Sequence, residues 1–212
     1  MQTFFLPQSV AAFGNEGMRI VVDAGHGGID GGVSGVRTGV KESDVNLSIA
    51  YALKARLEEM GFEVIMTRKT EAGLYGAPTK GFKRRDMEAR QKIIEKASPL
   101  AVISIHQNFY SSRSVRGGQV FYNGEQERSG ALGEAIQTEL NTLYGEIGVK
   151  NRGAKAGNYF ILECTDFPSV IVECGFLSNP NDDELLCSST WKGRLSQAIA
   201  AGVMGYLSGS FA

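Results

Sequence analysis

Residues 18–42 read MRIVVDAGHGGIDGGVSGVRTGVKE. The aliphatic run at 20–22 is followed by glycine-rich sequence, which is typical of a buried strand in a parallel sheet. Glycines on both sides of His26 let the backbone turn and leave the imidazole uncrowded. Glu42 stands at the far end of the glycine-rich loop. The stretch therefore predicts a strand that delivers one histidine to an open loop.

The chain contains only one other histidine, His106, and it also follows an aliphatic segment, at 100–105. A third aliphatic segment, 170–172, leads to Glu173. Ligands of open α/β sheets collect at the carboxyl ends of strands, so we expect these side chains to face one crevice. Imidazoles and carboxylates are zinc ligands, and a catalytic zinc uses three of them and leaves a position for water.

These residues allow two other interpretations. A single histidine after a strand is more often a hydrogen-bonded structural residue, but two histidines together with acids favour a metal site. The glycine-rich loop could instead bind phosphate. However, GHGGIDGG does not match G-x-G-x-x-G, and the chain has no G-x-x-x-x-G-K-[ST] motif, so metal binding is the preferred interpretation.

Length and composition predict one globular domain. The chain has 212 residues, 42% of them hydrophobic, which is enough for a sizeable core. A net charge of −1 argues against nucleic-acid binding. We expect residues 18–212 to form the catalytic domain. Residues 1–17 are a poor signal peptide and are interpreted as an N-terminal arm, as the remnant of a signal or membrane anchor, or as a partner-binding segment.

The three cysteines, Cys164, Cys174 and Cys187, include no C-x-x-C pair. They therefore predict neither a disulfide framework nor a thiolate zinc site. A Cys-His hydrolase using Cys174 is conceivable. Neighbouring residues of a strand point to opposite faces, however, so Cys174 leaves the crevice if Glu173 enters it. The cysteines are interpreted mainly as packing residues.

Strand and helix patterns alternate along the chain, which predicts an α/β fold: a twisted, mostly parallel sheet with helices on both faces. Ser43 or Asp44 is expected to cap the first helix, with Glu42 exposed at its entrance. Most charges of the basic second helix are expected to be solvated, although one could hold a substrate carboxylate. The predicted helices are 43–60, 82–96, 127–144, a short one capped by 179–183, and 191–207; the strands after 20–22 are 62–67, 100–105, 118–122, 159–162 and 168–172.

Four separated motifs, VVDAGHGG, KES, SIHQN and NRGAKAGNYFILECTDFPSVIVECGFLSNPND, resemble those of the zinc-dependent N-acetylmuramoyl-L-alanine amidases of the amidase 3 family. The resemblance covers residues 19–207. The single-domain size and the last motif are most similar to the CwlD-type spore-cortex amidases. The resemblance implies a six-stranded sheet, with the zinc (Zn²⁺) ligands at His26, Glu42 and His106, the catalytic glutamate at Glu173, and further matching positions at Arg90 and Asn108.

The implied activity is hydrolysis of the amide bond between N-acetylmuramic acid and L-alanine in peptidoglycan, in spore-cortex (muramic-δ-lactam) formation or wall remodelling. That substrate implies an extracytoplasmic location. The chain has no room at 109–128 for the inhibitory helix of some relatives, and no wall-binding repeat. We therefore expect targeting or activation by a protein partner, or by a membrane anchor outside this sequence. A zinc peptidase acting on free peptides and an inactive wall-binding or regulatory module are the alternatives.

Overall fold

The computed structural model describes residues 18–210, so the predicted arm at 1–17 and the last two residues of the predicted domain lie outside the described residues. Its centre is a six-stranded sheet with the strand order β2-β1-β3-β6-β4-β5. Neighbouring strands are parallel, except that β4 and β6 are antiparallel. The predicted α/β class and the mostly parallel six-stranded sheet are confirmed. The strands are β1 (Arg19–Ala24), β2 (Glu63–Met66), β3 (Ala101–Asn108), β4 (Gln119–Tyr122), β5 (Lys155–Ala156) and β6 (Ser169–Phe176).

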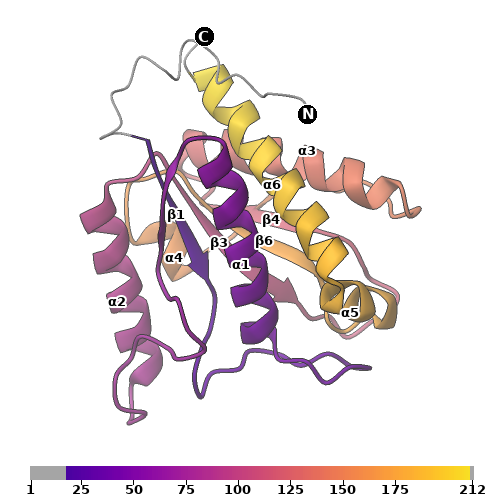
Figure 1. Ribbon diagram of the computed structural model, residues 1–212, viewed down its shortest axis with the longest axis horizontal. Helices are drawn as coiled ribbons and strands as arrows, with labels where there is room; N and C mark the ends of the chain where they lie inside the picture. The colour runs from indigo at the N-terminus through magenta and orange to yellow at the C-terminus, as the bar shows by residue number, and fades with distance from the viewer. Residues whose placement is uncertain (1–17, 211–212) are drawn as a thin grey trace.

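Helices cover both faces of this sheet, as predicted. The helices α1, α3 and α6 pack on one face and against one another, whereas α2 and α4 pack on the other. In Figure 1, α1 and α6 lie in front of the strands and α2 stands at the left edge. The helices are α1 (Glu42–Glu59), α2 (Phe82–Ala97), α3 (Glu127–Gly145), α4 (Phe160–Glu163), α5 (Pro180–Cys187) and α6 (Ser189–Ser210).

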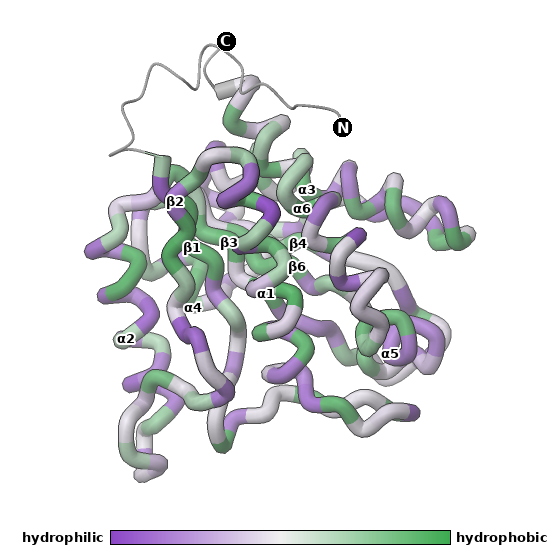
Figure 2. The backbone as a smooth tube through the Cα atoms, viewed as in Figure 1, coloured by the Kyte–Doolittle hydropathy of each residue, from purple (hydrophilic) through white to green (hydrophobic). Residues whose placement is uncertain are grey.

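Alternation along the strands separates the two layers of core. In β1, Ile20 and Val22 face the α1 side, while Val21 faces α2. Hydrophobic residues are concentrated along β1 and β3 in the interior (Figure 2). Both strands are buried on both faces, which explains why their sequences are continuous aliphatic runs.

The predicted strand at 159–162 is wrong, because Phe160–Glu163 form the single helical turn α4. The edge strand comes earlier, at Lys155–Ala156, and pairs with β4. Aromatic and β-branched residues favour a strand, but packing overrides this preference. Adjacent Ile161 and Leu162 are both buried in the core layer under α2, which a helical turn permits and an alternating strand does not.

The expected start of the first helix also needs correction. The helix begins at Glu42 with Lys41 as its N-cap, and neither Ser43 nor Asp44 caps it. Backbone carbonyls of the preceding loop take the place of a side-chain cap. The N–H of Glu42 donates to Val33 O and that of Ser43 donates to Gly31 O. By contrast, Asn179 caps α5 with its side chain, as predicted.

The cysteines are free thiols. Cys174 is buried in the core on the α1 side of the sheet, opposite to Glu173, as the strand alternation predicts. Cys187 is exposed, so its interpretation as a packing residue is wrong. Within residues 18–210 the structure contains no helix with the length and apolar character needed to cross a bilayer.

Candidate active site

Three side chains from different elements converge where β1 and β3 lead out of the sheet. His26 follows β1 by two residues, Glu42 is the first residue of α1, and His106 belongs to β3. The two histidines meet because β1 and β3 are parallel neighbours, and their ring centroids lie 5.0 Å apart. One candidate ligand atom from each of the three residues lies within 4.8 Å of the others. The structure thus brings together the ligand set that the sequence predicts.

The facing atoms of this cluster fit a zinc ion. Glu42 Oε1 lies 3.3 Å from His26 Nε2 and 3.0 Å from His106 Nδ1. Ligand atoms around a tetrahedral zinc, each about 2.0 to 2.1 Å from the metal, are separated by about 3.3 Å. Two nitrogens and one oxygen are also donors that zinc accepts in catalytic sites. The distances between these atoms and their chemical types therefore fit a zinc site with three protein ligands.

Glu42 is buried rather than exposed, with 3% of its surface accessible. Its Oε2 accepts a hydrogen bond from Val33 N (3.0 Å), and Oε1 accepts one from Gln107 N (3.1 Å). Burial alone would raise the pKa of Glu42, but the bonds to His106 and His26 hold that pKa well below its usual range. The side chain is therefore a fixed anion.

His26 is oriented by a residue that the sequence patterns do not single out. Its Nδ1 lies 3.1 Å from Asp30 Oδ2, which leaves Nε2 free to face Glu42. A carboxylate on the far nitrogen is the usual partner of a metal-binding histidine. Asp30 is the only acid between the first two ligands in the sequence, and that isolation is the signal that could have identified it.

Gly25 permits the close approach of the two histidine-bearing segments. A Cβ atom at this position would lie 2.1 Å from His106 Nε2, so no other residue fits there without moving the ring. The N–H of Gly25 donates to Ile105 O, which continues the pairing of β1 with β3 beyond Ala24. His26 itself has a φ of 61°, a left-handed conformation that costs a non-glycine residue about 1 to 2 kcal/mol.

Arg90 is almost fully buried and supports this strained backbone. It is 1% exposed, and it donates to the carbonyls of Ala24 (2.9 Å) and His26 (2.7 Å). Its charge is balanced by Asp23 and Asp86. The structure thus places Arg90 behind the cluster, against the backbone that carries His26.

The acid beneath the site, Asp23, is held ionised. Burial alone would raise its pKa, but the Arg90 charge and hydrogen bonds from the hydroxyls of Ser104 and Thr67 lower it to about 2. Asp23 therefore remains the counter-charge of Arg90 throughout the physiological pH range.

A second buried arginine, Arg68, was not predicted. It is 2% exposed and donates to the carbonyls of Ala24 (2.8 Å), Gly25 (3.0 Å) and Ser43 (2.7 Å). These bonds tie the segment before His26 to the first turn of α1, which carries Glu42. The sequence gives no signal for this role, because Arg68 begins a polar loop of ordinary composition.

Glu173 lies beside His106, as its register partner on the neighbouring strand β6. Adjacent strands are about 4.8 Å apart, so the two side chains share one face of the sheet. Burial raises the pKa of Glu173 to about 7; His106 opposes this rise and Glu42 adds to it. Its Oε2 is buried and has no hydrogen-bond partner within residues 18–210. The carboxyl group is thus able to exchange a proton near neutral pH.

A pocket of about 280 Å³ opens next to the cluster on the α2 side of the sheet. Apolar atoms make up most of its accessible lining, although charged side chains also border it. The residues that line the pocket are Asp23, Gly25, His26, Asp30, Tyr75, Phe82, Lys83, Asp86, Met87, Arg90, Ser104, His106, Tyr159, Phe160, Ile161 and Ile171.

Asn108 lies at the end of β3, where the pairing with β6 shifts by a bulge. Its side-chain oxygen accepts a hydrogen bond from Phe109 N (2.8 Å), which is a local contact. Asn108 lies two residues after His106 in the sequence, and in the structure its side-chain oxygen is occupied by the backbone N–H of the next residue.

The chain is similar to known amidases over nearly its whole length. The family model for N-acetylmuramoyl-L-alanine amidase (Amidase_3) matches residues 20–204. The germination-specific N-acetylmuramoyl-L-alanine amidase of Bacillus subtilis is 34% identical over 197 residues, covering 90% of this chain and 80% of that protein. LytC of the same organism is 28% identical over 192 residues, covering 90% of this chain and 36% of that protein.

The CwlD amidase of Clostridioides difficile, solved in complex with the GerS lipoprotein, has a TM-score of 0.85 and 33% identity, with 90% of this chain and 98% of that chain covered. The catalytic domain of CwlV from Bacillus (Paenibacillus) polymyxa has a TM-score of 0.77 and 27% identity, with the same coverage. The motifs, the fold and the matched family model agree. This chain belongs to the Amidase_3 family of N-acetylmuramoyl-L-alanine amidases.

Proposed function

We propose that this chain hydrolyses the amide bond between N-acetylmuramic acid and L-alanine in peptidoglycan, at a zinc site formed by His26, Glu42 and His106, with Glu173 as the catalytic acid and base. The observation that carries the proposal is the convergence of three ligand atoms within 4.8 Å, beside a buried acid whose pKa is raised to about 7. The family and its activity agree with this chemistry.

The chain's own residues divide the work. Zinc held by the three ligands would supply a Lewis acid and lower the pKa of water. Glu173 accepts a proton from the attacking water on its carboxylate and returns it to the nitrogen of the departing L-alanine as the C–N bond breaks. A pKa near 7 suits both transfers, since the carboxyl group must first lack the proton and then give it up. The adjoining pocket receives the substrate groups that flank the amide bond.

The supporting residues have narrower roles in this proposal. Arg90 and Arg68 fix the backbone carbonyls before and at His26, and Asp30 fixes the orientation of its ring. Asn108 holds the turn after β3. We assign none of these four a part in proton transfer.

The relatives support a location and a biological context for this activity. One is a germination-specific amidase, and another is solved with a lipoprotein partner. We propose that this chain acts outside the cytoplasm in spore-cortex formation or wall remodelling, and that a protein partner targets or activates it.

The test separates the metal ligand from the acid. Glu173→Ala is expected to lower the rate of release of N-terminal alanine from purified peptidoglycan by about 10² to 10⁴-fold, while zinc content stays near one per chain. Glu42→Ala is expected to lose both zinc and activity. Glu134→Ala, on the exposed side of α3, is the matched control and keeps both. A zinc-loaded Glu173→Ala protein with full activity would rule out the proposed role.

A further inference from the structure

We propose that Asp183 is a positioning residue for the metal site: it pins the loop at 33–41 and thereby holds Glu42 in the orientation that binds zinc. Asp183 belongs to α5 and follows Glu42 by 141 positions in the sequence. Its carboxylate bonds to Arg37 and Thr38 and not to the three proposed ligands. The inference rests on the proposed zinc site and adds a residue to it.

The loop acts on Glu42 through Val33. It folds back on itself, with a bridge between Ser34 and Lys41 and a hydrogen bond from Gly35 N to Val40 O (2.9 Å). This return brings Val33 beside Glu42, whose N–H donates to Val33 O (2.8 Å). In exchange, Val33 N donates to Glu42 Oε2 (3.0 Å). Because Oε2 is occupied in this way, Oε1 is the oxygen that faces both imidazoles.

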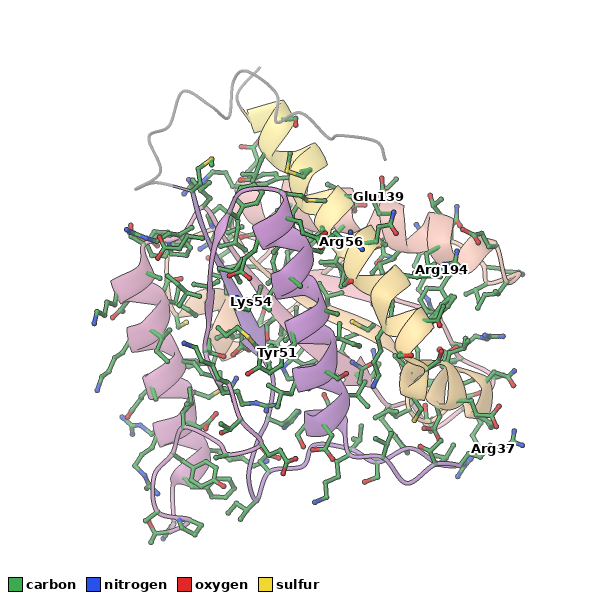
Figure 3. The ribbon with its side chains drawn as sticks, in the orientation of Figure 1. Arg37, Tyr51, Lys54, Arg56, Glu139 and Arg194 are labelled. Carbon is green, nitrogen blue, oxygen red and sulfur yellow. The ribbon has the colours of Figure 1, made fainter. Side chains whose placement is uncertain are left out.

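Asp183 holds the tip of the same loop through hydrogen bonds. It has no accessible surface, and its carboxylate accepts hydrogen bonds from Arg37 N (2.7 Å), Thr38 N (2.9 Å) and Thr38 Oγ1 (2.5 Å). Hydrogen bonds to an ionised acceptor are about twice as strong as neutral ones. Figure 3 shows Arg37 at the end of this loop near α5, where its side chain pairs with Glu184 of that helix (3.0 Å) while its backbone N–H donates to Asp183.

The fit around the carboxylate is close. A Cβ atom at Gly35 would lie 2.1 Å from Asp183 Oδ1, so this part of the loop approaches the acid as only glycine can. Val36 N also donates to Leu177 O (3.1 Å), directly after β6. The loop that presents Glu42 is therefore docked on the segment that follows Glu173, which fixes the ligand and the acid in one frame.

An acid in the first turn of α5 could simply stabilise that helix, as Asp182 and Asp183 both would through the helix dipole. The contacts argue for more. The N-cap of α5 is satisfied by Asn179, whereas all three bonds to the Asp183 carboxylate come from the loop. The carboxylate thus serves the metal-ligand loop rather than its own helix.

The experiment compares the zinc affinity of the variant Asp183→Ala with that of the unsubstituted chain, by competition with a chromophoric chelator. The substitution removes the acceptors of all three hydrogen bonds from the loop, and we expect zinc to bind about 10 to 100-fold more weakly, as for other groups that support metal ligands. Glu184→Ala is the matched control, because this neighbouring acid is exposed and pairs with the Arg37 side chain (3.0 Å) rather than with the loop backbone. Its zinc affinity is expected to stay within about twofold.

A second variant protects the test against misfolding. Thr38→Val removes an exposed hydroxyl that donates to Asp183 and accepts from Val40 N (3.2 Å), and it leaves Asp183 in place. We expect about a three- to tenfold weaker affinity. Affinities equal to that of the unsubstituted chain, with or without a loss of apo-protein stability, would overturn the inference and leave the zinc site standing. An unsubstituted chain that binds no zinc would overturn both.

Discussion

The two faces of the sheet are built for different purposes. On the α1, α3 and α6 side, the strands present mostly apolar side chains, and Gly202 lets α6 approach α3 so closely that a Cβ there would lie 2.5 Å from Ile136 Cα. On the α2 and α4 side, the same strands begin with Val21, Val102 and Ile171 but continue with polar groups. These are Asp23, Ser104, His106 and Glu173.

This difference follows from the two-residue period of a strand. A change of composition at alternate positions converts one face into a charged site and leaves the other face intact. The apolar layer supplies stability, and the interrupted layer places titratable groups at the mouth of the pocket. Substitutions in the apolar layer should therefore lower stability without changing metal binding, whereas substitutions in the polar layer should change metal binding.

The largest effect is expected for Arg90→Met. It leaves Asp23 buried without its cation, and removing one partner of such a pair costs about 3 to 5 kcal/mol in free energy of unfolding. Zinc affinity should fall as well, because the carbonyl of His26 loses its donor. Urea unfolding and zinc titration measure the two effects. The double variant Asp23→Asn with Arg90→Met should recover part of the stability; no recovery would contradict the proposed cause.

On the opposite face, Leu195→Ala tests the apolar layer. This fully buried side chain of α6 is remote from the site, and its truncation should lower the free energy of unfolding by about 3 kcal/mol. The folded fraction should bind zinc as the unsubstituted chain does. Urea unfolding followed by zinc titration under native conditions checks both statements, and a parallel loss of zinc affinity would show that the two faces are not independent.

Acid should weaken the polar face selectively. The pKa of Asp23 is lowered from 3.8 to about 2 in the folded chain, so its contribution is complete above pH 3.8 and is lost as pH falls towards 2. The loss should be on the order of 2 kcal/mol. Comparing the unfolding free energy of the unsubstituted chain and Asp23→Asn across this range isolates the effect. Two curves of equal slope would argue against it.

The smallest effect belongs to the solvated side of α1. Arg56 pairs with Glu59 (2.8 Å) on an exposed surface, and Figure 3 shows it on the outer side of the helix. Arg56→Ala should change the free energy of unfolding by no more than about 0.5 kcal/mol and leave zinc binding unaltered. A change above about 1 kcal/mol would show that this surface contributes to the core layer beneath it.

The alternation of strands and helices and the cluster of His26, Glu42 and His106 could be predicted from the sequence. Periodicity reports which residues are buried, and parallel strands bring their carboxyl ends to one edge. The depth of Glu42 could not be predicted, because it depends on a loop that folds back over the start of α1. For the same reason, the loop carbonyls replaced the expected caps at Ser43 and Asp44.

The second arginine shows the limit most clearly. In the sequence, Arg90 and Arg68 stand among polar residues, as solvated charges do. In the structure, both are buried next to the site and donate to backbone carbonyls. Every residue has a backbone carbonyl, so no pattern of side chains in the sequence predicts which carbonyls accept these hydrogen bonds. The prediction of a strand at 159–162 failed for a related reason, since the helical turn at Phe160–Glu163 is favoured by its packing against α2 and not by its local sequence.

The position of β6 in the sheet has a consequence for how this molecule assembles. The three proposed metal ligands come from the first half of the chain, but Glu173 lies on β6, which occupies the position between β3 and β4, two strands that precede it in the sequence. As the chain emerges from its N-terminal end, the ligand strands can pair while this central slot remains open. Insertion of β6 completes the centre of the sheet and also brings in the proposed catalytic acid. A partly assembled chain would therefore hold the proposed metal ligands without the acid needed to cut its substrate.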